Sequence, residues 1–81
     1  MSETQENASV AMSIDDIFTK LTERVSDYNA RLMIQSALIM SGMDQKTSDL
    51  NKEEAKTICL ELIKKGGPAF QVGKDLYQRV Q

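Results

Sequence analysis

The sequence predicts an all-α fold, a small bundle of three to four helices. Apolar residues recur at steps of three and four over most of the chain, which is the period of an amphipathic helix. The chain contains one proline among its 81 residues, and no stretch shows the strict alternation of a β-strand. A chain of this length forms one domain, so we expect residues 13–81 to make a single helical domain.

The N-terminal segment MSETQENASVAM is made of polar and small residues and has no apolar period. Such a segment cannot bury enough apolar surface to order itself, so residues 1–12 are predicted to be a disordered tail. Ser13 is a good N-cap, and Asp15 and Asp16 follow in the first turn, where the helix dipole favours negative charge. A helix is therefore expected to begin at residue 14.

A seam of apolar residues then runs along the chain in alternating steps of four and three, with a single polar member at Gln35. No proline or glycine interrupts it before Gly42, so one long N-terminal amphipathic helix over residues 14–41 is the simplest interpretation. The alternative is a break near Ser26 and Asp27, either of which can cap a second helix. The seam consists of Ile14, Phe18, Leu21, Val25, Tyr28, Leu32, Gln35 and Ile39.

The part of this stretch after Arg31 is apolar around most of the helix circumference. A helix that is apolar on all sides is normally a buried one. This part is therefore predicted to lie at the centre of the domain, and the part before Arg31 to be the more exposed end.

The C-terminal half predicts a helical hairpin. Asn51 is a good N-cap for a helix over residues 52–65. Gly66-Gly67 then supply the left-handed conformation that ends a helix, and Pro68 can open the next one, over residues 68–80. The two short helices are expected to pack against each other.

The residue inventory argues against an enzyme. The chain has no histidine, and Cys59 is its only cysteine, so neither an intrachain disulfide nor a Cys–His nucleophile can form. Cys59 lies on the apolar face of its predicted helix and is interpreted as a small buried hydrophobe. The acidic pairs Asp15-Asp16 and Glu53-Glu54 occupy first helical turns, where they compensate the dipole. No catalytic, cofactor-binding or metal-binding residue is predicted.

The overall charge and hydropathy limit the classes of partner that the sequence predicts. The net charge is −2, with both signs interspersed, which does not favour nonspecific binding to nucleic acid or to an anionic membrane. No apolar run is long enough to span a bilayer, and the N-terminus lacks the pattern of a signal peptide. A lone cysteine is typical of a reducing compartment, so we expect a cytoplasmic protein without membrane association.

The leading functional hypothesis is based on the apolar seam. A helix of about 28 residues is roughly 40 Å long, whereas each hairpin helix is about 20 Å, so part of the seam is expected to stay uncovered. Its 3.5-residue repeat suits another copy of the chain or a different protein. We therefore predict a non-enzymatic interaction module, such as an adaptor, a chaperone-like protein or a regulatory subunit, that forms homo-oligomers. Its predicted partner-binding residues are Phe18, Leu21, Val25, Tyr28 and Leu32.

A DNA-binding regulator is the alternative hypothesis. Two short helices joined by a glycine-containing turn are the outline of a helix-turn-helix. Residues 50–81 carry six basic and four acidic side chains, and the last helix offers Lys74 and Arg79. A recognition helix normally comes with a broader basic surface for phosphates, which ranks this hypothesis second.

Overall fold

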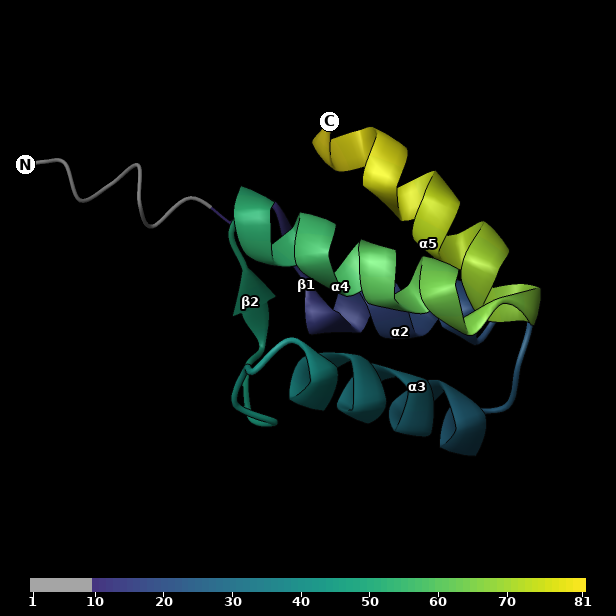
Figure 1. Cartoon of the computed structure of the whole chain (residues 1–81). Coiled ribbons are helices and arrows are strands. Elements are labelled where there is room, and N and C mark those ends of the chain that lie inside the picture. Colours follow the sequence, from purple (N-terminus) through teal and green to yellow (C-terminus); the bar gives the residue numbers. More distant parts are fainter. Residues whose placement is uncertain (1–9) are drawn as a thin grey trace, which may run out of the picture.

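The computed structural model describes residues 10–81, which form four helices and two very short strands (Figure 1). The predicted helix over residues 52–65 is confirmed at both ends, and the predicted helix over 68–80 begins one residue earlier. A small, mostly helical bundle is therefore confirmed. The elements are β1 (Met12–Ser13), α2 (Ile14–Leu21), α3 (Asp27–Met40), β2 (Asp49–Leu50), α4 (Lys52–Lys65) and α5 (Gly67–Val80).

A two-stranded antiparallel sheet joins the start of α2 to the start of α4. Met12 pairs with Leu50, and both side chains are buried. The amide of Ala11 donates a hydrogen bond of 2.8 Å to the carbonyl of Leu50. The predicted tail covers residues 1–12, of which residues 1–9 lie outside the described residues. Met12, the last residue of that predicted tail, belongs to the core. Two-residue strands are too short to leave a period in the sequence.

Both predicted helix caps are confirmed. The Ser13 hydroxyl accepts a hydrogen bond from the amide of Asp16, whose carboxylate accepts one from the amide of Ser13. Asn51 and Glu54 make the same reciprocal pair at the start of α4. These capping boxes satisfy amides that the first turn of a helix leaves without partners.

The prediction of a single long N-terminal helix over residues 14–41 is wrong. Helix α2 ends at Leu21, and α3 begins at Asp27 with Ser26 as its N-cap, the Ser26 hydroxyl accepting a 3.1 Å hydrogen bond from the amide of Asn29. The alternative break near Ser26 and Asp27 is confirmed. After the break, α2 and α3 both pack against the hairpin, which buries more apolar surface than one straight helix could.

Helix α3 lies at the edge of the fold (Figure 1), and its Leu32, Ile39 and Met40 side chains are exposed. Ile17 and Leu21 of α2 are fully buried, and α2 contacts both α3 and α5. The prediction that the chain after Arg31 forms the centre of the domain is therefore wrong. The chain after Arg31 is apolar around its circumference because one face of α3 packs inside the domain while the opposite, outer face is also apolar and is exposed.

The hairpin of α4 and α5 forms the largest contact between elements. Gly66 alone separates the two helices, and it takes the left-handed conformation with φ of 78°. Further along, a Cβ atom on Gly73 would lie 2.7 Å from the carbonyl oxygen of Cys59, so only glycine allows the backbones to approach this closely. The core that this packing creates contains Ile17, Leu21, Leu38, Leu50, Ile58, Cys59, Leu62, Val72 and Leu76.

Candidate functional site

The structure separates the five predicted partner-binding residues into three groups. Leu21 is completely buried, so it cannot contact a partner of the folded domain. Phe18 and Val25 are partly buried against the core. Tyr28 is 71% exposed and Leu32 is 45% exposed. The exposed part of the seam is therefore its C-terminal part, on α3, and not the N-terminal part that the sequence indicated.

Helix α3 carries apolar side chains on two opposite faces. Its inner face packs on the bundle through Ala30, Ile34, Ala37 and Leu38. Its outer face carries Tyr28, Leu32, Gln35 and Ile39, which fall within a sector about 60° wide at 3.6 residues per turn. We call these four residues the outer stripe. Ile39 is 54% exposed, and the exposed Met40 stands beside it.

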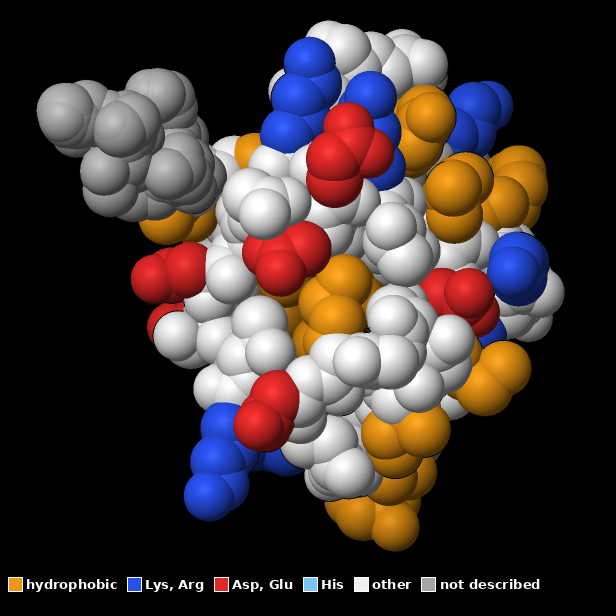
Figure 2. Space-filling model, turned by 60° about the vertical axis from the view of Figure 1, so that its left-hand side comes forward, with side chains coloured by type: hydrophobic (Ala, Val, Ile, Leu, Met, Phe, Trp, Pro, Cys, Tyr) orange, Lys and Arg blue, Asp and Glu red, His pale blue; other side chains and the backbone are white. Residues whose placement is uncertain are grey.

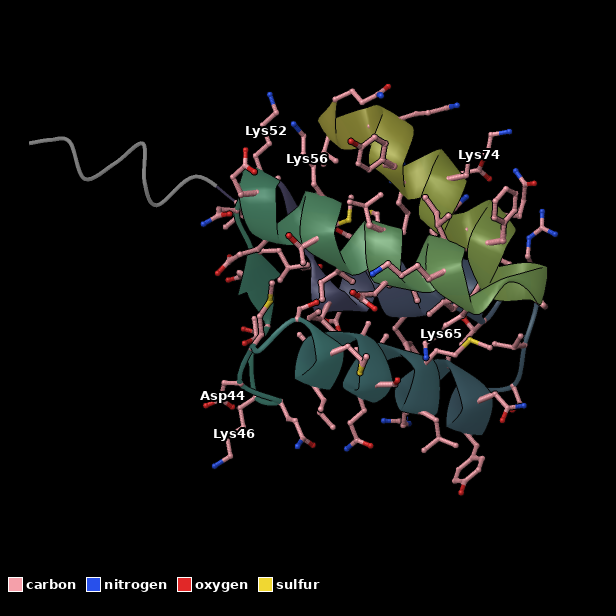
Figure 3. The ribbon with its side chains drawn as sticks, viewed as in Figure 1. Asp44, Lys46, Lys52, Lys56, Lys65 and Lys74 are labelled. Carbon is pink, nitrogen blue, oxygen red and sulfur yellow. The ribbon has the colours of Figure 1, made fainter. Side chains whose placement is uncertain are left out.

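The outer stripe faces away from the rest of the molecule. Side chains of α3 project from its lower side into solvent (Figure 3). In the space-filling view, apolar side chains also project along the lower edge of the molecule, where α3 lies (Figure 2). A contiguous apolar strip on the surface of a small protein is typical of an interaction site.

Helix α3 itself carries two charged side chains, Asp27 at its start and Arg31 beside the outer stripe. Asn29 and Ser36 flank it on one side, and Arg31 flanks it on the other. Lys65 of α4 donates a 2.8 Å hydrogen bond to the Ser36 hydroxyl, which ties α3 to the end of α4. Three other lysines, Lys52, Lys56 and Lys74, lie on the far side of the molecule, over α4 and α5 (Figure 3).

A groove of about 370 Å³ lies between α2 and α3, next to the outer stripe. The Arg31 guanidinium sits 5.1 Å from the centroid of the Phe18 ring across this groove, a cation–π contact that links the two helices. Gln35, which belongs to the stripe, and Arg31, which flanks it, both line the groove, so the two features form one continuous surface. The other lining residues are Ile14, Asp15, Ile34, Leu38 and Gln45.

Both ends of α3 are held by local hydrogen bonds. Ser26 caps its start. At its end Gly42 has φ of 73°, the Gly42 amide donates to the Ile39 carbonyl, and the Met43 amide donates to the Leu38 carbonyl. This paired arrangement is a Schellman motif, which stops a helix at a glycine. The outer stripe therefore sits on a helix with defined ends and a packed inner face.

Two features of the described residues bear on chemistry, the placement of possible metal ligands and the environment of Cys59. Within residues 10–81, no group of three histidine, cysteine or acidic residues is placed to hold a metal ion. Cys59 is buried, and its burial raises the pKa of the thiol from 9.0 to about 11. A thiol with a raised pKa is a poor nucleophile at neutral pH because little thiolate is present.

The raised pKa of Cys59 predicts how stability depends on pH. The folded state keeps its thiol proton up to about pH 11, whereas the unfolded chain releases it near pH 9.0. The unfolded state therefore binds fewer protons between these values, and stability falls as pH rises from about 9. Thermal unfolding at pH 8 and pH 10 checks this. The wild type should lose more stability than Cys59→Ala, and equal losses would contradict the buried thiol.

The hairpin differs from the helix-turn-helix that the alternative hypothesis requires. A helix-turn-helix joins its helices at about 90–120° through a turn of three to four residues. Here Gly66 alone separates α4 from α5, so the turn is shorter than that of a helix-turn-helix. Lys74 and Arg79 are exposed on α5.

Comparisons with known proteins add no assignment. No family model matches the chain, and neither a curated protein nor a solved structure matches it. Among the described residues, no helix has both the length and the apolar character needed to cross a membrane. The functional interpretation therefore rests on the geometry of α3.

Proposed function

We propose that this protein is a non-enzymatic helical interaction module that binds through the outer stripe of α3 and self-associates there. The observation that carries the proposal is a helix with apolar side chains on two faces, only one of which the domain covers. Burying an exposed large apolar side chain stabilises a contact by about 1.5–3 kcal/mol when burial is complete. Tyr28, Leu32 and Ile39 offer three such side chains within about three turns.

The size of the stripe sets the expected strength of the contact. Its four residues span roughly 16 Å of helix at 1.5 Å per residue. Stable complexes bury about 800 Å² on each partner, more than a stripe of this length provides by itself. The neighbouring groove, with Phe18 partly exposed at its wall, extends the surface. We therefore expect reversible association with a dissociation constant at or above about 1 μM. Association of this strength suits an adaptor or a regulatory subunit.

Sedimentation of two matched variants tests the proposal. Leu32 and Leu60 are both leucines and both are 45% exposed, but Leu60 lies on α4, away from the stripe. Leu32→Asp should abolish the concentration-dependent rise in mass, because it places a charge where an apolar contact forms. Leu60→Asp should leave that rise unchanged. Circular dichroism should show both variants folded.

Two results would contradict the proposal. One is a wild-type protein that stays monomeric up to millimolar concentration. The other is an equal effect of the two leucine substitutions, because that would place the contact on no particular face. The melting temperature of the wild type provides a second measurement, since it should rise with protein concentration if the folded state self-associates.

A further inference from the structure

We infer that the outer face of the α4–α5 hairpin is a second binding surface, which takes an acidic segment of another protein that carries apolar side chains between its carboxylates. The inference goes beyond the proposed function, because this surface is separate from the outer stripe and its use does not depend on self-association. We call it the hairpin face. It consists of Lys52, Lys56 and Leu60 of α4 and Phe70, Lys74 and Tyr77 of α5.

The packing of α4 on α5 brings the two halves of the hairpin face together. A Cβ atom on Gly73 would lie 3.0 Å from the backbone nitrogen of Ile63, so these two positions mark the junction of the helices. At 3.6 residues per turn, the three α4 residues of the face lie within about 60° of Ile63. Phe70 and Tyr77 lie within about 60° of Gly73 around α5, and Lys74 follows Phe70 by one turn. Both groups therefore border the same junction.

Apolar side chains make up half of the hairpin face. Leu60 is 45% exposed and Phe70 is 42% exposed. Tyr77 is partly buried and packs against the core, so its ring is held in place. Exposed apolar side chains that lie together on a small protein are typical of an interaction site. A partner of this face is therefore expected to be apolar in part.

The other half of the hairpin face is basic. Within residues 10–81, no carboxylate forms an ion pair with Lys52, Lys56 or Lys74. These three lysines lie over α4 and α5 (Figure 3). Basic and apolar side chains lie side by side over the upper part of the molecule, with an acidic side chain among them (Figure 2). Glu53, which is exposed beyond Leu60 around α4, borders the face, and the lysines outnumber it.

The remaining acidic side chains of the hairpin point away from this face. Glu54 and Glu61 lie roughly 140–160° from Lys56 around α4. Lys65 lies on that same side and donates its hydrogen bond to α3, so the glutamates lie on the α3 side of α4. On α5, Asp75 accepts a hydrogen bond of 3.0 Å from a side chain of the same helix. The hairpin is thus sorted by charge, although its composition is mixed.

An acidic segment with apolar side chains complements both halves of the hairpin face. Carboxylates of the segment would lie against the lysines, and complementary charge speeds association and sets specificity. Single-stranded nucleic acid also combines negative charge with groups that stack on aromatic rings. However, Leu60 is the most exposed apolar side chain of the face and offers no ring for stacking, and the chain as a whole has a net charge of −2. A peptide segment is therefore the better match.

Fluorescence anisotropy with labelled synthetic peptides tests the inference. The probe is a peptide of glutamate, leucine and phenylalanine residues. Two control peptides of equal length carry lysine in place of each glutamate, or serine in place of each apolar residue. Only the first peptide should bind tightly enough to saturate. Its affinity should fall as ionic strength rises from about 0.01 M to about 1 M, because the Debye length shortens from about 30 Å to about 3 Å.

Two exposed lysines provide a matched pair of variants. Lys74 belongs to the hairpin face, whereas Lys46 lies in the loop before β2, at the opposite edge of the molecule (Figure 3). Lys74→Glu should lower the affinity for the acidic peptide about tenfold, since it removes one attraction and adds one repulsion. Lys46→Glu makes the same change in net charge and should leave the affinity unchanged. Circular dichroism should show both variants folded.

The outcomes separate this inference from the proposed function. A selective loss in Lys74→Glu supports the inference, and so does Leu32→Asp binding the peptide as the wild type does, because that variant alters only the outer stripe. A wild type that stays monomeric but binds the peptide selectively contradicts the proposed function alone. Equal losses in the two lysine variants, or no binding up to millimolar peptide, overturn the inference. Tighter binding of oligothymidylate than of the acidic peptide overturns the choice of a peptide partner.

Discussion

Leu21→Asp should unfold the whole domain. Leu21 is completely buried at the end of α2, which packs against β1, α3 and α5. The substitution removes the transfer free energy of the leucine side chain, leaves a cavity, and places a carboxylate among apolar groups. We expect a loss of about 5 kcal/mol or more, which approaches the total stability of a domain of this size. Far-ultraviolet circular dichroism and urea denaturation measure it.

The control for this variant is Leu21→Met, which nearly conserves volume and should cost less than about 1.5 kcal/mol. A Leu21→Asp protein that stays helical and only loses self-association would contradict the fold, because it would place Leu21 on the surface. The contrast with Leu32→Asp is informative. Two leucines from the same apolar seam should give different results, one losing the fold and the other only the dimer.

Gly73→Val should destabilise the hairpin by roughly 1–3 kcal/mol or more. A Cβ at position 73 would lie 2.7 Å from the Cys59 carbonyl oxygen and 3.0 Å from the backbone nitrogen of Ile63. Both atoms belong to the backbone of α4, so the helices must move apart to accept a side chain. The expected gain in helix propensity, about 1 kcal/mol for Gly→Ala, is too small to offset that movement. Thermal and chemical unfolding measure the loss.

Gly73→Ala should lose some stability, and Gly73→Val should lose more. Lys74→Ala is the control in the next position, where the side chain is exposed, and it should stay within about 0.5 kcal/mol of the wild type. A Gly73→Ala protein more stable than the wild type would contradict the close approach of α4 and α5. Such a result would mean that only the helix propensity of residue 73 matters.

Features that depend on neighbouring residues were predictable from the sequence. The N-caps at Ser13 and Asn51 were predicted, and both are present as capping boxes, because the groups that make them lie three residues apart in the chain. Helix α4 has the predicted bounds for the same reason. The left-handed Gly66 follows from the need for a residue without a Cβ atom at the turn.

Features that depend on distant contacts were not predictable. The seam from Ile14 to Ile39 is regular enough for one helix, but residues 22–26 interrupt it because α2 and α3 bury more apolar surface side by side. The pairing of Met12 with Leu50 joins residues far apart in sequence. Ile17, which lies outside the seam, is fully buried because it lies within about 40° of Leu21 on the inner face of α2. The heptad period alone cannot indicate how wide the covered face of a helix is.

The candidate site shows the same division. Tyr28 and Leu32 were predicted as partner-binding residues, and both are exposed, whereas Leu21 was predicted with them and is core. The apolar circumference of α3 is visible in the sequence and predicts full burial. A helix can also be apolar all round when one face packs inside and the other faces outward.

Local spacing alone thus determined that this protein is a small helical domain, with its helix caps and its hairpin. Local spacing also showed that the chain has more apolar side chains than one core requires. Tertiary structure decided which of those side chains lie inside. The physical reason is that an isolated helix with two apolar faces has no preferred inner side. Helices α2 and α4 pack on α3 and cover the face that carries Ile34, and the face of Tyr28, Leu32 and Ile39 is left on the surface.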